Sequence, residues 1–141
     1  MNSTPNANFR RDEIPLWING ISILVAAILT FQSISAYVNP SWAYGLFDNT
    51  TLANQQVMMV LGGRNVVMLL LTLLALRSQN AMFLTYTFIM HLIREAQDMF
   101  IVPYFEGFTT IKGIGIFLTF LLVFVIPYLF AIKKLRTLAE K

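Results

Sequence analysis

Apolar residues gather into four runs along the chain, each close to the ~20 residues that a helix needs to cross a hydrocarbon core. The runs cover residues 14–38, 55–76, 80–102 and 111–132. They are separated by a segment at residues 39–54, a short link at residues 77–79, and a turn marked by Pro103 and Gly107. We therefore predict an all-α integral membrane four-helix bundle, whose second and third helices are antiparallel neighbours because the link between them is so short.

The two ends of the chain differ from these runs. Residues 1–13 are polar and are predicted to be a disordered amino terminus, whereas residues 133–141 form a basic tail. The first apolar run exceeds the ~7–15 residues of a signal-peptide core, and no small-residue cleavage site follows it. We interpret this run as a retained first helix.

Basic residues between and around the runs predict the orientation. Arg10, Arg11, Arg77 and the basic residues of the tail would share one side of the membrane, and the other side has only Lys112. The positive-inside rule then places both termini in the cytoplasm. We expect a multi-pass protein of the bacterial inner (plasma) membrane. In this topology Trp17 and Tyr128 are expected near the inner interface, and Trp42 near the outer one.

Composition agrees with a membrane protein. Hydrophobic residues make up 57% of the chain and charged residues 12%, against about 25% charged in soluble domains. The net charge of +3 comes largely from the tail, and no aromatic residues interleave with it, so we expect no nucleic-acid partner. The absence of cysteine excludes disulfides, thiol catalysis and thiolate metal sites.

The third run carries the polar centre of the chain. His91, Arg94, Glu95 and Asp98 stand at positions i, i+3, i+4 and i+7, so a helix places all four on one stripe. Ionisable groups are costly in hydrocarbon and normally face a bundle interior or a wet cavity, where they have partners. This stripe is the first candidate for a functional site.

The second run adds Arg64, which follows Gly62 and Gly63 and precedes Asn65. At about 1.5 Å of rise per residue, Arg64 falls level with the turn between His91 and Glu95. We predict that Arg64 pairs with Glu95, and that Arg94 pairs with Asp98 four residues later. The two glycines are expected to allow close helix packing. Gln32 of the first run lies at a similar depth, and Trp42 lies in the segment that caps this end.

Two functional hypotheses follow, beside the simpler reading that the ion pairs only fix the register of the bundle. In the first, the site performs acid–base chemistry on a lipophilic molecule, such as isomerisation, cyclisation or epoxide opening. His91, Glu95 and Asp98 would supply the proton-transferring groups, and Arg64 would stabilise an anion. The ligand-binding residues would be Arg94, Asn65, Gln32 and Trp42. In the second, the chain is an accessory subunit of a membrane redox or transport complex, and binds lipid, quinone or a partner helix without chemistry.

The same residues are a poor metal site. His91, Glu95 and Asp98 have helical ligand spacing, but the chain has a single histidine and lacks the second Glu-x-x-His element of di-iron bundles. We therefore predict no metal and no cofactor. The expected partners are the lipid bilayer, a lipophilic small molecule, and a membrane-protein partner or a second copy of the chain.

Several short motifs resemble one known family. They are Asn39-Pro40 followed by an aromatic residue and Gly45, the stretch Leu61–Asn65, the stretch Ala75–Arg77, and an acid late in the third run, Asp98. Over residues 14–132 their order is similar to that of the DoxX-like superfamily of small four-helix membrane proteins. The resemblance implies a four-helix bundle and, as in some members, a link to quinone or sulfur redox proteins. Related sequences often have Asp where this chain has Asn65, so a proton-transfer role of that acid does not carry over.

Overall fold

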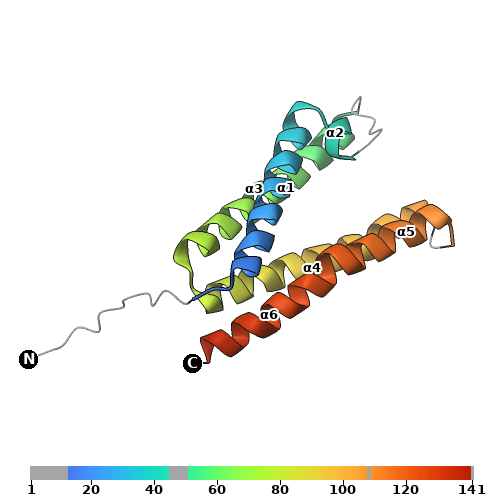
Figure 1. The fold of residues 1–141 in the computed structure, drawn as a ribbon. Helices are drawn as coiled ribbons and strands as arrows, with labels where there is room; N and C mark the ends of the chain where they lie inside the picture. The colour runs from blue at the N-terminus through green and yellow to red at the C-terminus, as the bar shows by residue number, and fades with distance from the viewer. Residues whose placement is uncertain (1–12, 45–50, 108, 141) are drawn as a thin grey trace, which may run out of the picture. The chain divides into compact units, whose positions relative to one another are not determined.

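The computed structural model describes residues 13–44, 51–107 and 109–140. All regular structure within these ranges is helical, which confirms the predicted helical class. The elements are α1 (Leu16–Val38), α2 (Ser41–Tyr44), α3 (Leu52–Ser78), α4 (Ala81–Glu106), and a continuous last helix made of α5 (Ile111–Thr119), the π-helical segment η1 (Phe120–Val125) and α6 (Ile126–Ala139) (Figure 1).

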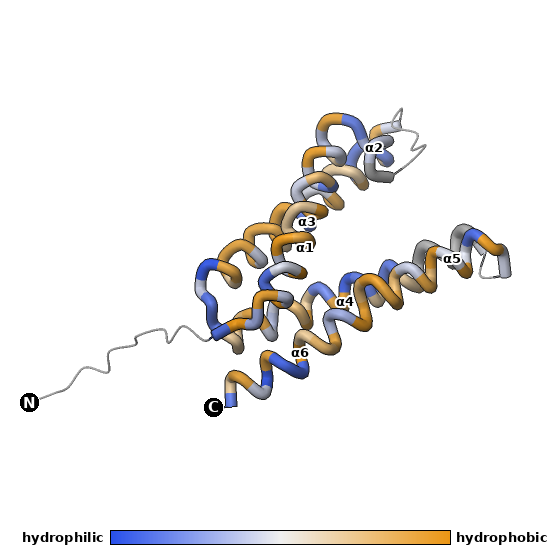
Figure 2. Tube along the Cα trace, in the orientation of Figure 1, coloured by the Kyte–Doolittle hydropathy of each residue, from blue (hydrophilic) through white to orange (hydrophobic). Residues whose placement is uncertain are grey.

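Three of these helices are long and apolar enough to cross a membrane: α1, α3 and the last helix, Ile111–Ala139. This finding supports an integral membrane protein. Helix α4 has a comparable length of 26 residues but carries the charged stripe, and hydrophilic stretches interrupt it in Figure 2. That α4 also spans the membrane, that the four helices form one bundle, and that both termini are cytoplasmic stay predictions.

The helices form two units. One comprises residues 15–77, with α1, α2 and α3, and the other comprises residues 78–140 together with Glu13 and Ile14. In the first unit α1 and α3 run side by side, and in the second α4 runs alongside the last helix (Figure 1). Each unit contains part of the predicted site.

Gly62 lies at the contact between α1 and α3. A Cβ atom at this position would fall 2.8 Å from Cε2 of Tyr37 and 3.0 Å from Cβ of Ala36. The Tyr37 hydroxyl also donates a hydrogen bond of 3.4 Å to the carbonyl oxygen of Met59 on α3. The absent side chain at Gly62 therefore allows the two helices to approach, as expected for a small residue in a membrane-helix contact.

The turn between α4 and α5 depends on two glycines. Gly107 ends α4 with a φ of 87°, a region that glycine adopts without steric cost. Thr110 caps α5 by accepting a hydrogen bond from the Gly113 N–H at 2.9 Å. A Cβ atom on Gly113 would fall 2.1 Å from the Gly107 carbonyl oxygen, so no larger residue fits there. The predicted third turn thus begins at Gly107, and α4 continues past Pro103.

The last helix continues beyond the predicted end of its span at residue 132, through the basic tail, to Ala139. Lysine, arginine and leucine are good helix formers, and cations near a helix C-terminus interact favourably with its dipole. Most of the predicted disordered terminus, residues 1–12, and the middle of the outer segment, residues 45–50, lie outside the described residues.

A π-helical turn precedes Pro127. Within η1 the hydrogen bonds span five residues, so the N–H of Ile126 donates to the carbonyl oxygen of Leu121. In a regular α-helix the Pro127 ring would clash with the carbonyl of Val123, four residues earlier. The wider π turn moves that carbonyl and lets the helix continue into α6. Such turns occur mostly as single interruptions of α-helices, frequently at functional sites.

Candidate functional site

Tyr128 is the centre of an aromatic cluster between α4 and the last helix. Its ring lies 5.4 Å from that of Phe88, 5.9 Å from that of His91 and 6.4 Å from that of Phe124, measured between centroids. These separations are typical of favourable contacts between rings. The side chain is 1% exposed, so Tyr128 is enclosed by protein, and its predicted depth near the inner membrane interface stays a prediction.

His91 faces this cluster from α4. The residue is 1% exposed, and its imidazole plane is tilted by 40° from the Tyr128 ring. Phe88 lies three residues before His91 on the same helical face, so one turn of α4 supplies both contacts. The arrangement places an imidazole and a phenol, each able to donate and accept a proton, next to each other in the protein interior.

Glu95 forms an ion pair with its sequence neighbour Arg94. Consecutive residues of a helix point in different directions, so the Arg94 side chain must bend across the helix surface to reach the carboxylate. The Glu95 side chain is 3% exposed and that of Arg94 10%. The pairing was not predicted from the sequence. It places one cation and one anion within a turn of His91.

The other pairings stay predictions. Asp98 is half-buried one turn after Arg94 on the same stripe of α4, where the predicted pair with Arg94 would form. Arg64 is half-buried on α3, next to Asn65, which is 2% exposed. Because α3 belongs to the first helical unit, the Arg64–Glu95 pair is not tested.

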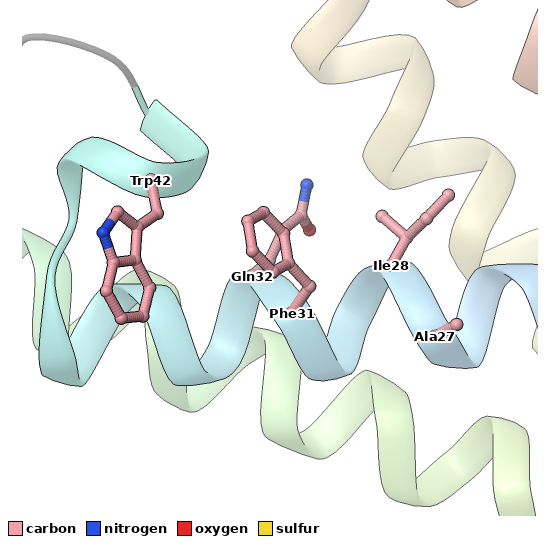
Figure 3. A pocket seen from close by; sticks show the side chains of 5 residues that line it. All are labelled: Ala27, Ile28, Phe31, Gln32 and Trp42. Atoms are coloured by element: carbon pink, nitrogen blue, oxygen red, sulfur yellow. The ribbon is translucent and has the colours of Figure 1, made fainter.

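Gln32 and Trp42, two predicted ligand-binding residues, line one open groove of about 410 Å³ in the first unit. Ala27, Ile28 and Phe31 complete its lining. Figure 3 shows Gln32 and Ile28 rising from the same side of α1, with the Trp42 indole reaching down from α2 beside them. The groove is therefore mostly apolar, with the Gln32 amide and the indole N–H as its polar groups.

The position of Trp42 follows from Asn39, which ends α1. Its side-chain oxygen accepts hydrogen bonds from the backbone N–H of Ser41 at 3.2 Å and from the Ser41 hydroxyl at 2.6 Å. Asparagine at such a position favours a tight turn into a new helix. The chain consequently folds back at Pro40, and the short helix α2 presents Trp42 to α1.

Within the described parts of the chain, no three histidine, aspartate or glutamate side chains lie close enough together to hold a metal ion. The structure thus gathers the predicted residues into two groups in different units: His91, Arg94 and Glu95 with Asp98 nearby, and Gln32 with Trp42. Tyr128 is the residue that sequence reasoning missed. The four-residue spacing of Phe120, Phe124 and Tyr128, which predicts one aromatic face, was the signal that could have found it.

Comparison of the chain with the models of known protein families, with curated proteins and with solved structures found no match.

Proposed function

We propose that this membrane protein binds a lipophilic small molecule at the aromatic and polar cluster of α4 and the last helix, and performs acid–base chemistry on it. The observation that carries the proposal is the enclosed contact between His91 and Tyr128, one turn from the Arg94–Glu95 ion pair. Histidine is the side chain most often used for proton transfer. The rings of Phe88 and Phe124 supply apolar walls suited to a lipophilic molecule.

The proposed roles divide between the two helices. His91 removes a proton from one carbon of the ligand and returns it to another, so the reaction is an isomerisation with no net change in protons. Tyr128 donates a hydrogen bond to the oxygen on which negative charge develops. The fixed Arg94–Glu95 pair helps to stabilise this developing charge. Preorganised dipoles and charges act strongly in a site that excludes water.

Deuterium incorporation tests this proposal without knowledge of the substrate. The full-length chain and its His91→Gln variant are extracted from their host membrane into nanodiscs, incubated in D₂O, and their bound lipophilic molecules are analysed by mass spectrometry. We expect a molecule that co-purifies with both proteins and gains carbon-bound deuterium only with the wild type. Gln97→Ala, an exposed residue of the same helix, serves as the control and should behave as the wild type.

Two other outcomes would overturn the proposal in different ways. If both proteins hold the same molecule and neither exchanges deuterium, the site binds without catalysis. If neither protein retains a lipophilic molecule above the level of an unrelated membrane protein, the ligand site itself is wrong.

A non-catalytic accessory subunit is the second candidate. The observation that favours it is the exposure of the last helix. Only 11% of the apolar 18-residue stretch of this helix is buried against the rest of the protein. Such a face suits a partner helix as well as lipid. In this case the partner would be a subunit of a membrane redox or transport complex, or a second copy of the chain.

The finer membrane assignment is also part of the proposal. We propose four spanning helices with both termini in the cytoplasm of a bacterial cell, because the Lys and Arg residues favour that side. Kinship with the DoxX-like superfamily is proposed on the motifs around Asn39 and Gly62. Both motifs have a structural role here, since Asn39 turns the chain into α2 and Gly62 admits Tyr37.

A further inference from the structure

A second open groove, of about 300 Å³, lies between the beginning of α4 and the end of α6. One stripe of α4 lines it with Met82, Thr85, Tyr86 and Ile89, and one stripe of α6 lines it with Arg136, Ala139 and Glu140. The spacing of both sets is i, i+3, i+4, so each helix presents a single face. The groove thus combines an apolar wall with charged groups at one end of the unit.

This groove is separate from the His91–Tyr128 cluster. Arg136 follows Tyr128 by about two helical turns, or about 12 Å along the axis. The proposed acid–base chemistry does not use this groove. Its position at the end of a membrane-length helix places it where hydrocarbon gives way to lipid headgroups.

The charge of this helix end points to an anionic occupant. Lys133, Lys134 and Arg136 are all exposed on α6, and Arg136 itself lines the groove. A guanidinium can bind a phosphate through two parallel hydrogen bonds, which a lysine cannot. Basic residues next to a membrane span attract anionic lipids.

The remaining lining residues fit the other parts of a phospholipid. The exposed side chains of Met82 and Tyr86, with Ile89, offer an apolar surface for the first carbons of an acyl chain. Tyrosine is enriched at this level of a membrane because its ring is apolar and its hydroxyl is polar. Glu140 is an acceptor and would repel a bare phosphate, but it can accept hydrogen bonds from headgroup hydroxyls.

We propose that the groove between α4 and α6 is a binding site for an anionic phospholipid with a hydroxylated headgroup, of the phosphatidylglycerol type. Arg136 binds the phosphate, Glu140 accepts from the headgroup hydroxyls, and the α4 stripe contacts an acyl chain. The site gives the second helical unit a preference for anionic over zwitterionic lipid.

Thermal unfolding of the full-length chain in detergent, with palmitoyl-oleoyl phosphatidylglycerol or phosphatidylcholine added, tests the proposal. We expect phosphatidylglycerol to raise the unfolding temperature more than phosphatidylcholine does. In Arg136→Gln the concentration needed for half of this rise should increase about fivefold or more, the effect of removing one basic contact with an anionic lipid. Arg136 is exposed, so the variant should fold.

Lys134→Gln is the matched control, because it removes the same charge from the same turn of α6 without touching the groove. It should keep the response of the wild type to phosphatidylglycerol. An equal loss in Lys134→Gln and Arg136→Gln would show attraction to a diffuse basic surface and would overturn the proposal. So would an undiminished response of Arg136→Gln, or an equal stabilisation by inorganic phosphate, which has no acyl chain to contact α4.

Discussion

The rings of His91 and Tyr128 lie 5.9 Å apart between centroids, and each side chain is 1% exposed. The contact joins the charged stripe of α4 to the last helix immediately after its π-helical turn and Pro127. A histidine enclosed only by aliphatic side chains would be a packing residue. An adjacent phenol gives this one a second group able to donate or accept a hydrogen bond.

Tyr128→Phe separates the packing role of this residue from its chemical role. The phenylalanine keeps the ring contacts with Phe88, His91 and Phe124 but removes the hydroxyl. If Tyr128 stabilises the developing charge, deuterium incorporation into the bound molecule should slow by about 100-fold, as when an oxyanion-stabilising donor is removed. The unfolding temperature should change little.

The control for this variant is Phe117→Leu, which alters an aromatic contact in α5, before the π-helical turn, where the ring of Phe117 lies 6.0 Å from that of Phe100. It should leave deuterium incorporation close to that of the wild type. Normal incorporation in Tyr128→Phe would assign Tyr128 to packing alone.

Glu95→Gln tests the ion pair of α4. The change removes the carboxylate that the structure pairs with the nearly buried Arg94 guanidinium. Breaking one side of a buried pair typically costs about 3–5 kcal/mol, so the variant should unfold at a clearly lower temperature. Asp98→Asn, at a half-buried position of the same stripe, should cost less.

A double-mutant cycle with Arg94→Gln isolates the pair. If the two groups interact as the structure shows, the cost of the double variant should be smaller than the sum of the single costs, by about 0.5–3 kcal/mol. Additive costs would show that Glu95 acts through other contacts.

The helices were predictable because their apolar runs have membrane length, and the charged stripe was predictable because helical periodicity fixes which residues share a face. Helix ends were less predictable. The α4–α5 turn depends on a positive φ at Gly107 and on the fit of Gly113 against its carbonyl, which are properties of a folded turn. Sequence alone favoured Pro103 as the end of α4.

Of the cluster between α4 and the last helix, the sequence predicted only the residues on α4. His91 and Glu95 follow from spacing, but Tyr128 lies 37 positions after His91 in the chain, and its burial depends on how α4 packs against the last helix. A tyrosine near the end of an apolar run is typical of a membrane interface, so the sequence offered no reason to place Tyr128 beside His91. The Arg94–Glu95 pair was missed because neighbouring residues on a helix do not normally face each other.

The orientation prediction can be tested on a clean background, since the chain has no cysteine. Ser41→Cys on α2 and Thr137→Cys on α6 both place a thiol at an exposed position. A membrane-impermeant maleimide added to whole cells should label Ser41→Cys and leave Thr137→Cys unlabelled until the membrane is broken. The opposite labelling pattern would invert the topology, and labelling of both from outside would contradict the number of crossings.

Gly62 and Gly63 provide a matched pair for the contact between α1 and α3. An alanine Cβ at Gly62 would meet Tyr37 at 2.8 Å and Ala36 at 3.0 Å, whereas at Gly63 it would meet the Tyr37 hydroxyl at 3.7 Å. Gly62→Ala should therefore displace the Tyr37 ring from α3, crowd Ala36 and destabilise the unit by about 1–3 kcal/mol. Gly63→Ala makes only ordinary contact and should stabilise α3 by about 0.5–1 kcal/mol, since alanine is the better helix former. Thermal unfolding of both variants in the same detergent measures the difference. Equal effects would mean that α1 and α3 do not pack closely at Gly62.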